Sequence, residues 1–304
     1  MTQDSERTDL QAPAVCDYEG SSYEQDFWIG QGRDYEDRIE RIALRRLLPP
    51  QGDTLIDIGA GFGRLADLYA GYERVILVDY SRTLLQKAQA RLGRAGTRFL
   101  YVAANVYSLP FADAVVDTAV MVRVIHHLTD VPAALAEIAR LIRPQGNLIL
   151  EFANKRNLKA IGRYALRRQS WSPFAAEPIE FVPLNYNFHP HWIEQALRRV
   201  GLAPQRQLSV SYFRMRALKR TVPLGVLTRL DSALQRTGKW WQLSPSTFVQ
   251  VRQTAQSGPT SGALFRCPVC HSEDLQAQEE RLACAQCNRQ WRVVDGLYDF
   301  KEPA

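Results

Sequence analysis

The sequence predicts an α/β protein with a doubly wound, largely parallel sheet, followed by a small metal-binding module. Short apolar runs alternate with stretches of helical periodicity between residues 34 and 154, which is typical of strands joined by crossover helices. Four of the five cysteines stand in two C-x2-C pairs within residues 267–287, a spacing typical of metal knuckles. Hydrophobic residues make up 46% and charged residues 23% of 304 residues, which excludes wholesale disorder.

The first expected element is a helix, because Ile39, Ile42 and Leu47 recur at helical spacing before two prolines. The strands that follow are nearly continuous apolar runs, as in a sheet covered on both faces. Strands are expected at 54–58, 75–78, 99–103, 115–122 and 147–152, with helices between them at 63–70, 81–92 and 131–142. Residues 1–33 are polar or without periodicity and are expected to form a mobile N-terminal segment.

Two insertions interrupt the alternation, at about 155–188 and 214–245. The first joins a basic helix to an aromatic, proline-bearing loop that is long for a connection inside a domain, so it is expected to act as a lid. The second combines a basic helix with Trp240 and Trp241. The predicted domain therefore spans 34–253, followed by a small, polar linker at 254–263 and a zinc-ribbon module at 264–304.

The formal net charge of +6 comes from the middle of the chain, where residues 153–256 contain 17 Lys and Arg but 4 Asp and Glu. This excess favours an anionic partner, with Lys155, Arg156 and Lys159 in the first insertion as candidates. A solvated helix face is the commoner explanation of such arginines. No run of about 18 apolar residues is present, which predicts a cytoplasmic protein without a membrane partner.

The densest signal is a glycine-rich turn between the first expected strand and the next helix. The strand contains Asp57, and Gly59, Gly61 and Gly63 follow. Glycines let a backbone turn tightly and approach a ligand. Asp79 ends the next strand, where a carboxylate could accept both hydroxyls of a ribose. The pattern is GxGxG and lacks the last glycine of the dinucleotide fingerprint, which disfavours a nicotinamide oxidoreductase.

These residues, with VDYS, NVYSLPF, VIHHL and IRPQG further on, resemble the class I S-adenosylmethionine (AdoMet)-dependent methyltransferases with a small-molecule-type domain. The resemblance covers about residues 34–252, with the motifs in the family's order. It implies a Rossmann-like seven-stranded sheet whose last strand is antiparallel. It also implies an enzyme that binds AdoMet across the ends of strands 1, 2 and 4 and transfers its methyl group to an acceptor by in-line displacement.

By this resemblance the glycine-rich turn would face the methionine part of AdoMet, and Asp57 would hold its amino group. Asp79 would accept from the ribose, and Tyr80 would pack on the adenine. Asn105 stands where the family usually has an aspartate, and its amide oxygen can still accept from the adenine amino group. The residues implied in cofactor binding are Asp57, Gly59, Ala60, Gly61, Gly63, Asp79, Tyr80, Asn105, Val106 and Arg123.

Arg123, His126 and His127 follow the fourth expected strand and are the candidates for a catalytic role. An imidazole titrates near neutral pH and could act as a general base. In families with this HH pair, however, the histidines mostly organise the loop and touch the cofactor. Arg123 could bind an acceptor anion or pair with a carboxylate. Alignment alone can carry methyl transfer, because the sulfonium is already electrophilic, so no catalytic residue need be visible.

The two cysteine pairs predict one structural Zn²⁺, since four thiolates leave no open coordination position. The ligands would be Cys267, Cys270, Cys284 and Cys287. An iron–sulfur or redox role is the alternative. FRCPVCHSEDL and LACAQCNRQWRVVDGLYDF resemble a zinc-ribbon family that includes the activating partner of methyltransferases acting on tRNA and translation factors, which implies a nucleic-acid or translation-related partner. His271 is surplus to the four ligands, and Cys16 is expected to be an incidental thiol.

A hypothesis of a different class is a catalytically silent Rossmann-like module that binds RNA or protein and carries the same zinc ribbon. AdoMet binding would separate the two hypotheses. The acceptor stays open, because no NPPY-type motif marks an amide or base nitrogen as the methylated atom.

Overall fold

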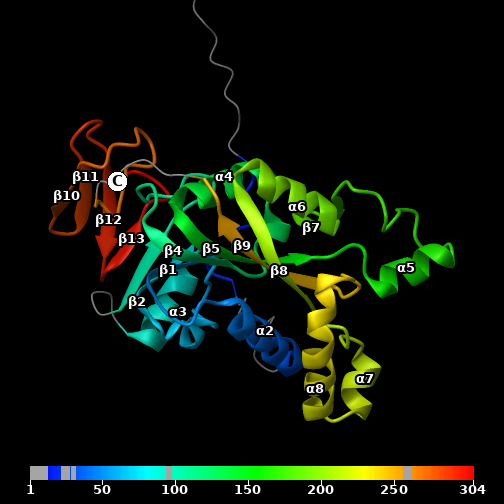
Figure 1. The fold of residues 1–304 in the computed structure, drawn as a ribbon. Helices are drawn as coiled ribbons and strands as arrows, with labels where there is room; N and C mark the ends of the chain where they lie inside the picture. Colours follow the sequence, from blue (N-terminus) through cyan, green and yellow to red (C-terminus); the bar gives the residue numbers. More distant parts are fainter. Residues whose placement is uncertain (1–12, 22–27, 29–31, 94–97, 256–261) are drawn as a thin grey trace, which may run out of the picture.

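The computed structural model describes residues 13–21, 28, 32–93, 98–255 and 262–304. Its centre is an 11-stranded sheet in the order β10-β11-β12-β13-β3-β2-β1-β4-β5-β9-β8 (Figure 1). The strands of this sheet are β1 (Gly52–Ile58), β2 (Tyr72–Asp79), β3 (Phe99–Ala103), β4 (Val116–Met121), β5 (Ile142–Ala153), β8 (Leu202–Val210), β9 (Ser246–Gln253), β10 (Leu275–Gln278), β11 (Arg281–Cys284), β12 (Gln290–Val294) and β13 (Leu297–Asp299). A separate hairpin pairs β6 (Ile179–Val182) with β7 (Asn185–Asn187).

Helices cover both faces of the sheet, so the apolar core has two layers. α4 (Val131–Leu141) and α6 (Pro190–Arg199) contribute to the core on one face. α2 (Asp34–Leu47) and α3 (Arg82–Leu92) contribute to the core on the other. The remaining helical elements of the described residues are η1 (Ala66–Tyr69), η2 (Ile125–His127), α5 (Leu158–Ala165), α7 (Arg216–Thr221), α8 (Leu224–Leu234) and η3 (Gln235–Lys239). Among the described residues, no helix has both the length and the apolar character needed to cross a membrane.

The expected count of seven strands is wrong for the whole sheet, because the C-terminal module extends it. The strands other than β10–β13 include the predicted antiparallel last strand, β9, which pairs antiparallel with both β5 and β8. β13 then pairs in parallel with β3, with Leu297 opposite Tyr101. An edge strand presents unpaired N–H and C=O groups. The module therefore continues the sheet at the β3 edge.

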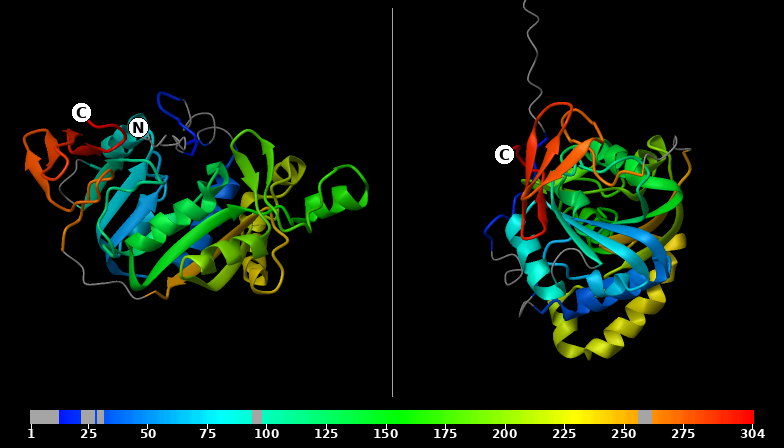
Figure 2. Two further views of the ribbon diagram at one scale, coloured as in Figure 1. Left: turned by 90° about the horizontal axis from the view of Figure 1, so that it is seen from above. Right: turned by 90° about the vertical axis from the view of Figure 1, so that its left-hand side faces the viewer.

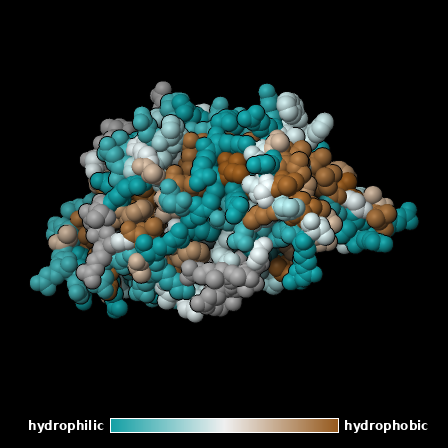
Figure 3. Space-filling view, turned by 90° about the horizontal axis from the view of Figure 1, so that it is seen from below, coloured by the Kyte–Doolittle hydropathy of each residue, from teal (hydrophilic) through white to brown (hydrophobic). Residues whose placement is uncertain are grey.

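The two predicted insertions form separate structures. The first contains α5 and the β6–β7 hairpin, and α5 projects from the body at the end away from β10–β13 (Figures 1 and 2). The second contains α7, α8 and η3, of which α8 packs against α2 and η3 against β8. Apolar side chains gather on the outer surface of this second insertion (Figure 3). Its exposed large hydrophobic residues are Met215, Val226, Leu230, Leu234, Trp240 and Trp241.

Candidate functional site

A pocket lies where the carboxyl ends of β1, β2 and β4 meet. The sheet register aligns these ends, with Ile58 opposite both Val78 and Met121. We call this cavity, which has an empty volume of about 700 Å³, the strand-end pocket. Its lining is Val15, Cys16, Tyr18, Ile58, Gly59, Gly61, Val78, Asp79, Tyr80, Leu84, Ala104, Val106, Arg123, Val124, His127 and Leu128. Parallel α/β sheets commonly bind ligands at this edge.

The glycine-rich turn is hydrogen-bonded to the end of β2. The Gly61 N–H donates to the Asp79 carboxylate at 2.7 Å, and the Gly59 N–H donates to the Val78 carbonyl at 2.8 Å. Gly59 has φ +75°, and a Cβ built there would lie 2.1 Å from a methyl carbon of Val124. Only glycine therefore fits this position without displacing the pocket wall.

Gly63 is not in the lining of the pocket and instead packs closely against α3. A Cβ at this residue would lie 2.8 Å from a methyl carbon of Leu92 on α3, and its φ is +73°. The chain then makes turns and the short η1 over Ala66–Tyr69, so the α-helix expected at 63–70 is wrong. The left-handed backbone of Gly63 prevents helical geometry from starting there.

Two carboxylates at the strand ends have raised pKa values. Asp57 is buried and accepts a hydrogen bond from the Tyr69 hydroxyl at 2.8 Å, and burial raises its pKa to about 7. Asp79 accepts the Ser81 N–H at 2.9 Å in addition to that of Gly61, and burial raises its pKa to about 6. Both groups would be stabilised as carboxylates by a ligand that offers hydrogen-bond donors or positive charge.

Other predicted cofactor residues lie near this pocket in different ways. Asp57 and Ala60 line a smaller adjoining pocket together with Trp28, which packs on the Arg64 guanidinium at 3.8 Å. Asn105 is outside the lining of the strand-end pocket, although both of its neighbours are in it. Its amide oxygen accepts the N–H of Tyr107 at 3.0 Å. That bond occupies one lone pair of the oxygen and leaves the other.

Residues 13–21, which we call the N-terminal strap, lie over the strand-end pocket. Cys16 and Tyr18 line it. The Glu19 carboxylate accepts two N–H groups at the start of α3, those of Arg82 at 2.7 Å and Thr83 at 3.0 Å. A carboxylate at a helix N-terminus is favourable because it meets unpaired N–H groups and the positive end of the helix dipole. The remaining parts of the predicted mobile segment, 1–12, 22–27 and 29–31, lie outside the described residues.

The C-terminal module contributes a cation to the rim of the same pocket. Lys301 Nζ lies 3.9 Å from the centroid of the Tyr80 ring and 3.8 Å from the Glu19 carboxylate. Arg82 Nε donates to Asp299 at 2.6 Å. Tyr80, the strap and the end of β13 therefore meet at one place. Nothing in the local sequence around Lys301 indicates this contact.

A second cavity adjoins the first, with an empty volume of about 1020 Å³. We call it the arginine pocket, and its lining is Tyr18, Arg33, Arg123, His126, His127, Ala153, Phe181, Asn185, Tyr186, Asn187 and Arg214. Tyr18, Arg123 and His127 line both pockets. The two cavities therefore share one wall. Residues of the β6–β7 hairpin in the first insertion line this pocket, whereas no α5 residue is in its lining. That the insertion acts as a lid stays a prediction.

His127 is held in one tautomer by a backbone carbonyl. Its Nδ1 lies 2.8 Å from the Leu184 carbonyl, which can only accept, so Nδ1 carries the proton. Nε2 is then an acceptor, 3.4 Å from the Tyr18 hydroxyl. Burial lowers the pKa of His127, which keeps the ring neutral. Burial, and then the neighbouring cations, also lower the pKa of His126, whose Nδ1 has no partner in the described part of the chain.

Arg123 pairs with a carboxylate, one of the two roles expected for it. Its side-chain Nε donates to the buried Glu40 at 2.9 Å, and its backbone N–H donates to the Glu151 carboxylate at 3.0 Å. Arg64 also donates to Glu40, at 2.9 Å. Burial alone would raise the pKa of Glu40, but Arg123 and Arg64 outweigh it and lower the pKa to about 2. Arg123 has φ +62°, an uncommon conformation for a residue with a Cβ.

The basic residues expected beside the acceptor are not in either pocket. Lys155 is buried and donates from Nζ to the Glu177 carbonyl at 2.6 Å. Arg156 lines a separate groove together with His189. Lys159 is exposed on α5. These cations are close in sequence to the aromatic loop of the first insertion but are not in the lining of either pocket. The reason is that β5 ends before them and the chain then leads into the projecting α5.

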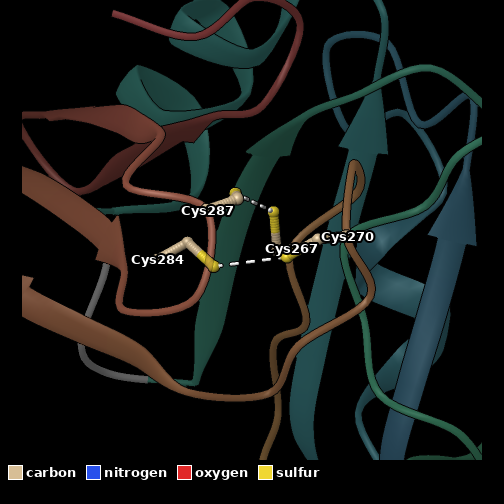
Figure 4. A group of neighbouring side chains, drawn as sticks. All are labelled: Cys267, Cys270, Cys284 and Cys287. Atoms are coloured by element: carbon tan, nitrogen blue, oxygen red, sulfur yellow. Dashed lines mark hydrogen bonds between the residues drawn. The ribbon is translucent and has the colours of Figure 1, made fainter.

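The four predicted metal ligands come together (Figure 4). One sulfur atom from each of Cys267, Cys270, Cys284 and Cys287 lies within 4.8 Å of the others. The Cys267–Cys287 and Cys270–Cys284 sulfur distances are 3.7 and 3.5 Å. A tetrahedron with metal–sulfur bonds of about 2.3 Å has edges of about 3.8 Å. The cluster could therefore hold one tetrahedral metal ion.

Comparison with known proteins identifies the central part of the chain. Residues 56–150 match the family model described as Methyltransferase domain. The O-methyltransferase cnsE of Penicillium expansum is 34% identical over 119 residues, which cover 38% of this chain and 43% of the relative. The ubiquinone/menaquinone biosynthesis C-methyltransferase UbiE of Paracoccus denitrificans is 34% identical over 123 residues, covering 38% and 49%. The chain thus spans about half the length of these relatives, and its residues 56–150 are similar to a methyltransferase domain.

Solved structures are similar in fold. A SAM-dependent methyltransferase of Thermotoga maritima, described as a possible histamine N-methyltransferase, has a TM-score of 0.52 at 19% identity, covering 76% of this chain and 95% of that one. A complex of the Haloferax volcanii Trm112 methyltransferase activator with a presumed methyltransferase gives 0.52 at 20%, covering 80% and 100%. The [4+2]-cyclase SpnF gives 0.51 at 17%, covering 76% and 87%. This fold therefore supports more than one chemistry.

Proposed function

We propose that the protein is an AdoMet-dependent methyltransferase. The observation that carries the proposal is the strand-end pocket, in which the glycine-rich turn and the Asp79 carboxylate meet at the ends of β1 and β2. This geometry stands in a chain whose residues 56–150 match a methyltransferase domain. AdoMet supplies an electrophilic methyl group when bound, and the protein's task is to bind and align it with an acceptor.

The predicted cofactor contacts are part of the proposal. Asp79 has lone pairs left to accept from two ribose hydroxyls, because the Gly61 and Ser81 N–H groups do not saturate a carboxylate. Tyr80 would cover the adenine from the pocket rim, and Ala104 and Val106 would line the far side of the ring. Asp57, in the adjoining pocket, would hold the methionine ammonium group.

We assign His127 as the acceptor-side base where the methyl acceptor carries a proton. Its Nε2 is unprotonated, and the residue lines both pockets. The acceptor atom would form its bond to the methyl carbon while the sulfur–carbon bond breaks, and its proton would pass to Nε2. His127→Asn should lower kcat by about 10²-fold or more, and AdoMet calorimetry on the same variant measures separately any loss of cofactor binding. An unchanged kcat would leave alignment as the whole of catalysis.

The cysteine cluster would hold one structural Zn²⁺, since four thiolates of tetrahedral spacing suit zinc and leave no open position. The module would then act as a covalently attached subunit that completes the sheet and the pocket rim. Its pairing with β3 and the Lys301 contact to Tyr80 support this role. Elemental analysis should find one zinc per chain. Iron, or no metal in protein purified without chelators, would refute the assignment.

The catalytically silent binding module remains the competing hypothesis, favoured by the exposed Trp240 and Trp241 beside basic residues of the second insertion. Calorimetry with AdoMet separates the two. A methyltransferase should bind AdoMet and transfer radiolabel from it to one fraction of a cell extract divided into RNA, protein and small molecules. Absence of AdoMet binding together with salt-dependent RNA binding would favour the silent module.

A further inference from the structure

The charge of the arginine pocket is one-sided. Its described lining contains Arg33, Arg123 and Arg214 with two histidines, and no aspartate or glutamate. A concave surface lined by one sign of charge and partly shielded from water attracts ligands of the opposite sign. The pocket is therefore electrostatically suited to an anion.

The carboxylates near this pocket are already engaged by other groups. Glu40 accepts from both Arg123 and Arg64. Glu151 accepts the Arg123 N–H at 3.0 Å and the Ser246 hydroxyl at 2.5 Å. Neither carboxylate lies within ion-pair distance of Arg214 in the part of the chain that the structure describes.

Arg214 is the cation that this arrangement leaves for a ligand. Its Nε is buried and has no hydrogen-bond partner among the described residues. A buried, unpaired N–H of a guanidinium group is costly. Because Arg214 lines the pocket, an anion bound beside its guanidinium would offset that cost. The planar guanidinium can bind a carboxylate or a phosphate through two parallel hydrogen bonds.

The rest of the lining suits the body of a flat, largely apolar molecule. Tyr18, Phe181 and Tyr186 supply aromatic rings, while Asn185 and Asn187 on the β6–β7 hairpin supply amide groups. Aromatic rings stack on planar ligands, and amides can hydrogen-bond to polar substituents. The wall shared with the strand-end pocket lies within reach of the same molecule, so its nucleophilic atom can approach the methyl group.

We infer that the arginine pocket binds the methyl acceptor, and that this acceptor is a planar, largely apolar molecule carrying a carboxylate or phosphate group held by Arg214. The inference rests on the proposed function for the identity of the ligand as an acceptor. It differs from the expectation drawn from the basic residues Lys155, Arg156 and Lys159, which lie outside this pocket.

Three small probes test the site directly: benzoate, phenyl phosphate and the neutral benzamide. Binding is measured by ligand-detected NMR, with and without S-adenosylhomocysteine. At least one of the two anions should bind the wild-type protein, and benzamide should not. Tighter binding of benzoate would indicate a carboxylate ligand, and tighter binding of phenyl phosphate would indicate a phosphate ligand. Arg214→Gln should weaken that binding about tenfold or more, and Arg214→Lys by less, since charge is retained but the fork is lost. Arg229→Gln, an exposed arginine on α8, should have no effect.

Equal binding of benzamide, unchanged anion binding in Arg214→Gln, or no anion binding at millimolar concentration would each overturn the inference. Thermal melting establishes that the variants are folded. AdoMet calorimetry on the same proteins separates the two proposals. Arg214-dependent anion binding without AdoMet binding would refute the proposed methyltransferase function and support the anion site. AdoMet binding without anion binding would support the methyltransferase function and refute the anion site.

Discussion

Replacement of Asp79 by alanine should abolish useful AdoMet binding while the protein stays folded. Two ribose hydroxyls donating to a carboxylate contribute about 1.5–3 kcal/mol each, or about 3–6 kcal/mol together. The dissociation constant should therefore rise by about 100-fold to 10,000-fold. The free protein also loses the acceptor of the Gly61 and Ser81 N–H groups. That loss is offset by removal of a carboxylate whose raised pKa records an unfavourable buried charge.

Calorimetric titration with AdoMet near pH 7.5 measures the affinity, and circular dichroism with thermal melting reports the fold. Asp79→Asn is a closer variant, because its amide oxygen can still accept from the Gly61 N–H. Asp53→Ala provides the control, since Asp53 is 72% exposed at the opposite end of β1. Wild-type affinity in a folded Asp79→Ala protein would refute the assignment of AdoMet to the strand-end pocket.

Three further predictions follow from the same contacts. The pKa of Asp79 is raised from 3.8 to about 6, so AdoMet affinity should fall as the pH drops through 6 and the carboxylate is protonated. The free protein should instead lose stability as the pH rises over about 4–6, because its folded state holds a proton that the unfolded chain releases. Flat profiles of affinity and of stability against pH would contradict this. Lys301→Ala should weaken AdoMet binding about two- to tenfold through Tyr80 and the strap, with Arg292→Ala, exposed on β12, as the unaffected control. Glu40→Gln should cost about 3–5 kcal/mol of unfolding free energy in urea, because it leaves two partly buried guanidinium groups without the buried carboxylate they share. Glu194→Gln on α6, which breaks an exposed ion pair, should cost under about 1 kcal/mol, and equal losses would refute the argument.

Local pattern in the sequence was sufficient for the features that depend on near neighbours. The alternation of apolar runs and helices predicted the sheet, because a strand buried on both faces needs consecutive apolar residues. The glycine-rich turn and Asp79 were found because parallel strands place their carboxyl ends at one edge. The four cysteines were found because a tetrahedral site needs two closely spaced pairs.

The contacts that complete the pockets depended on tertiary structure, because they join residues far apart in the chain. Tyr18 lies against His127, and Lys301 lies over Tyr80 only because β13 pairs with the edge of β3. Arg214 is one basic residue among many in a strongly basic segment, and its sequence neighbours do not distinguish it. The chain composition determined that this segment is basic. The packing of the strands, the hairpin and the second insertion decided which of these cations lines a pocket and has no carboxylate partner within the described structure. Burial and pairing are properties of the assembled fold.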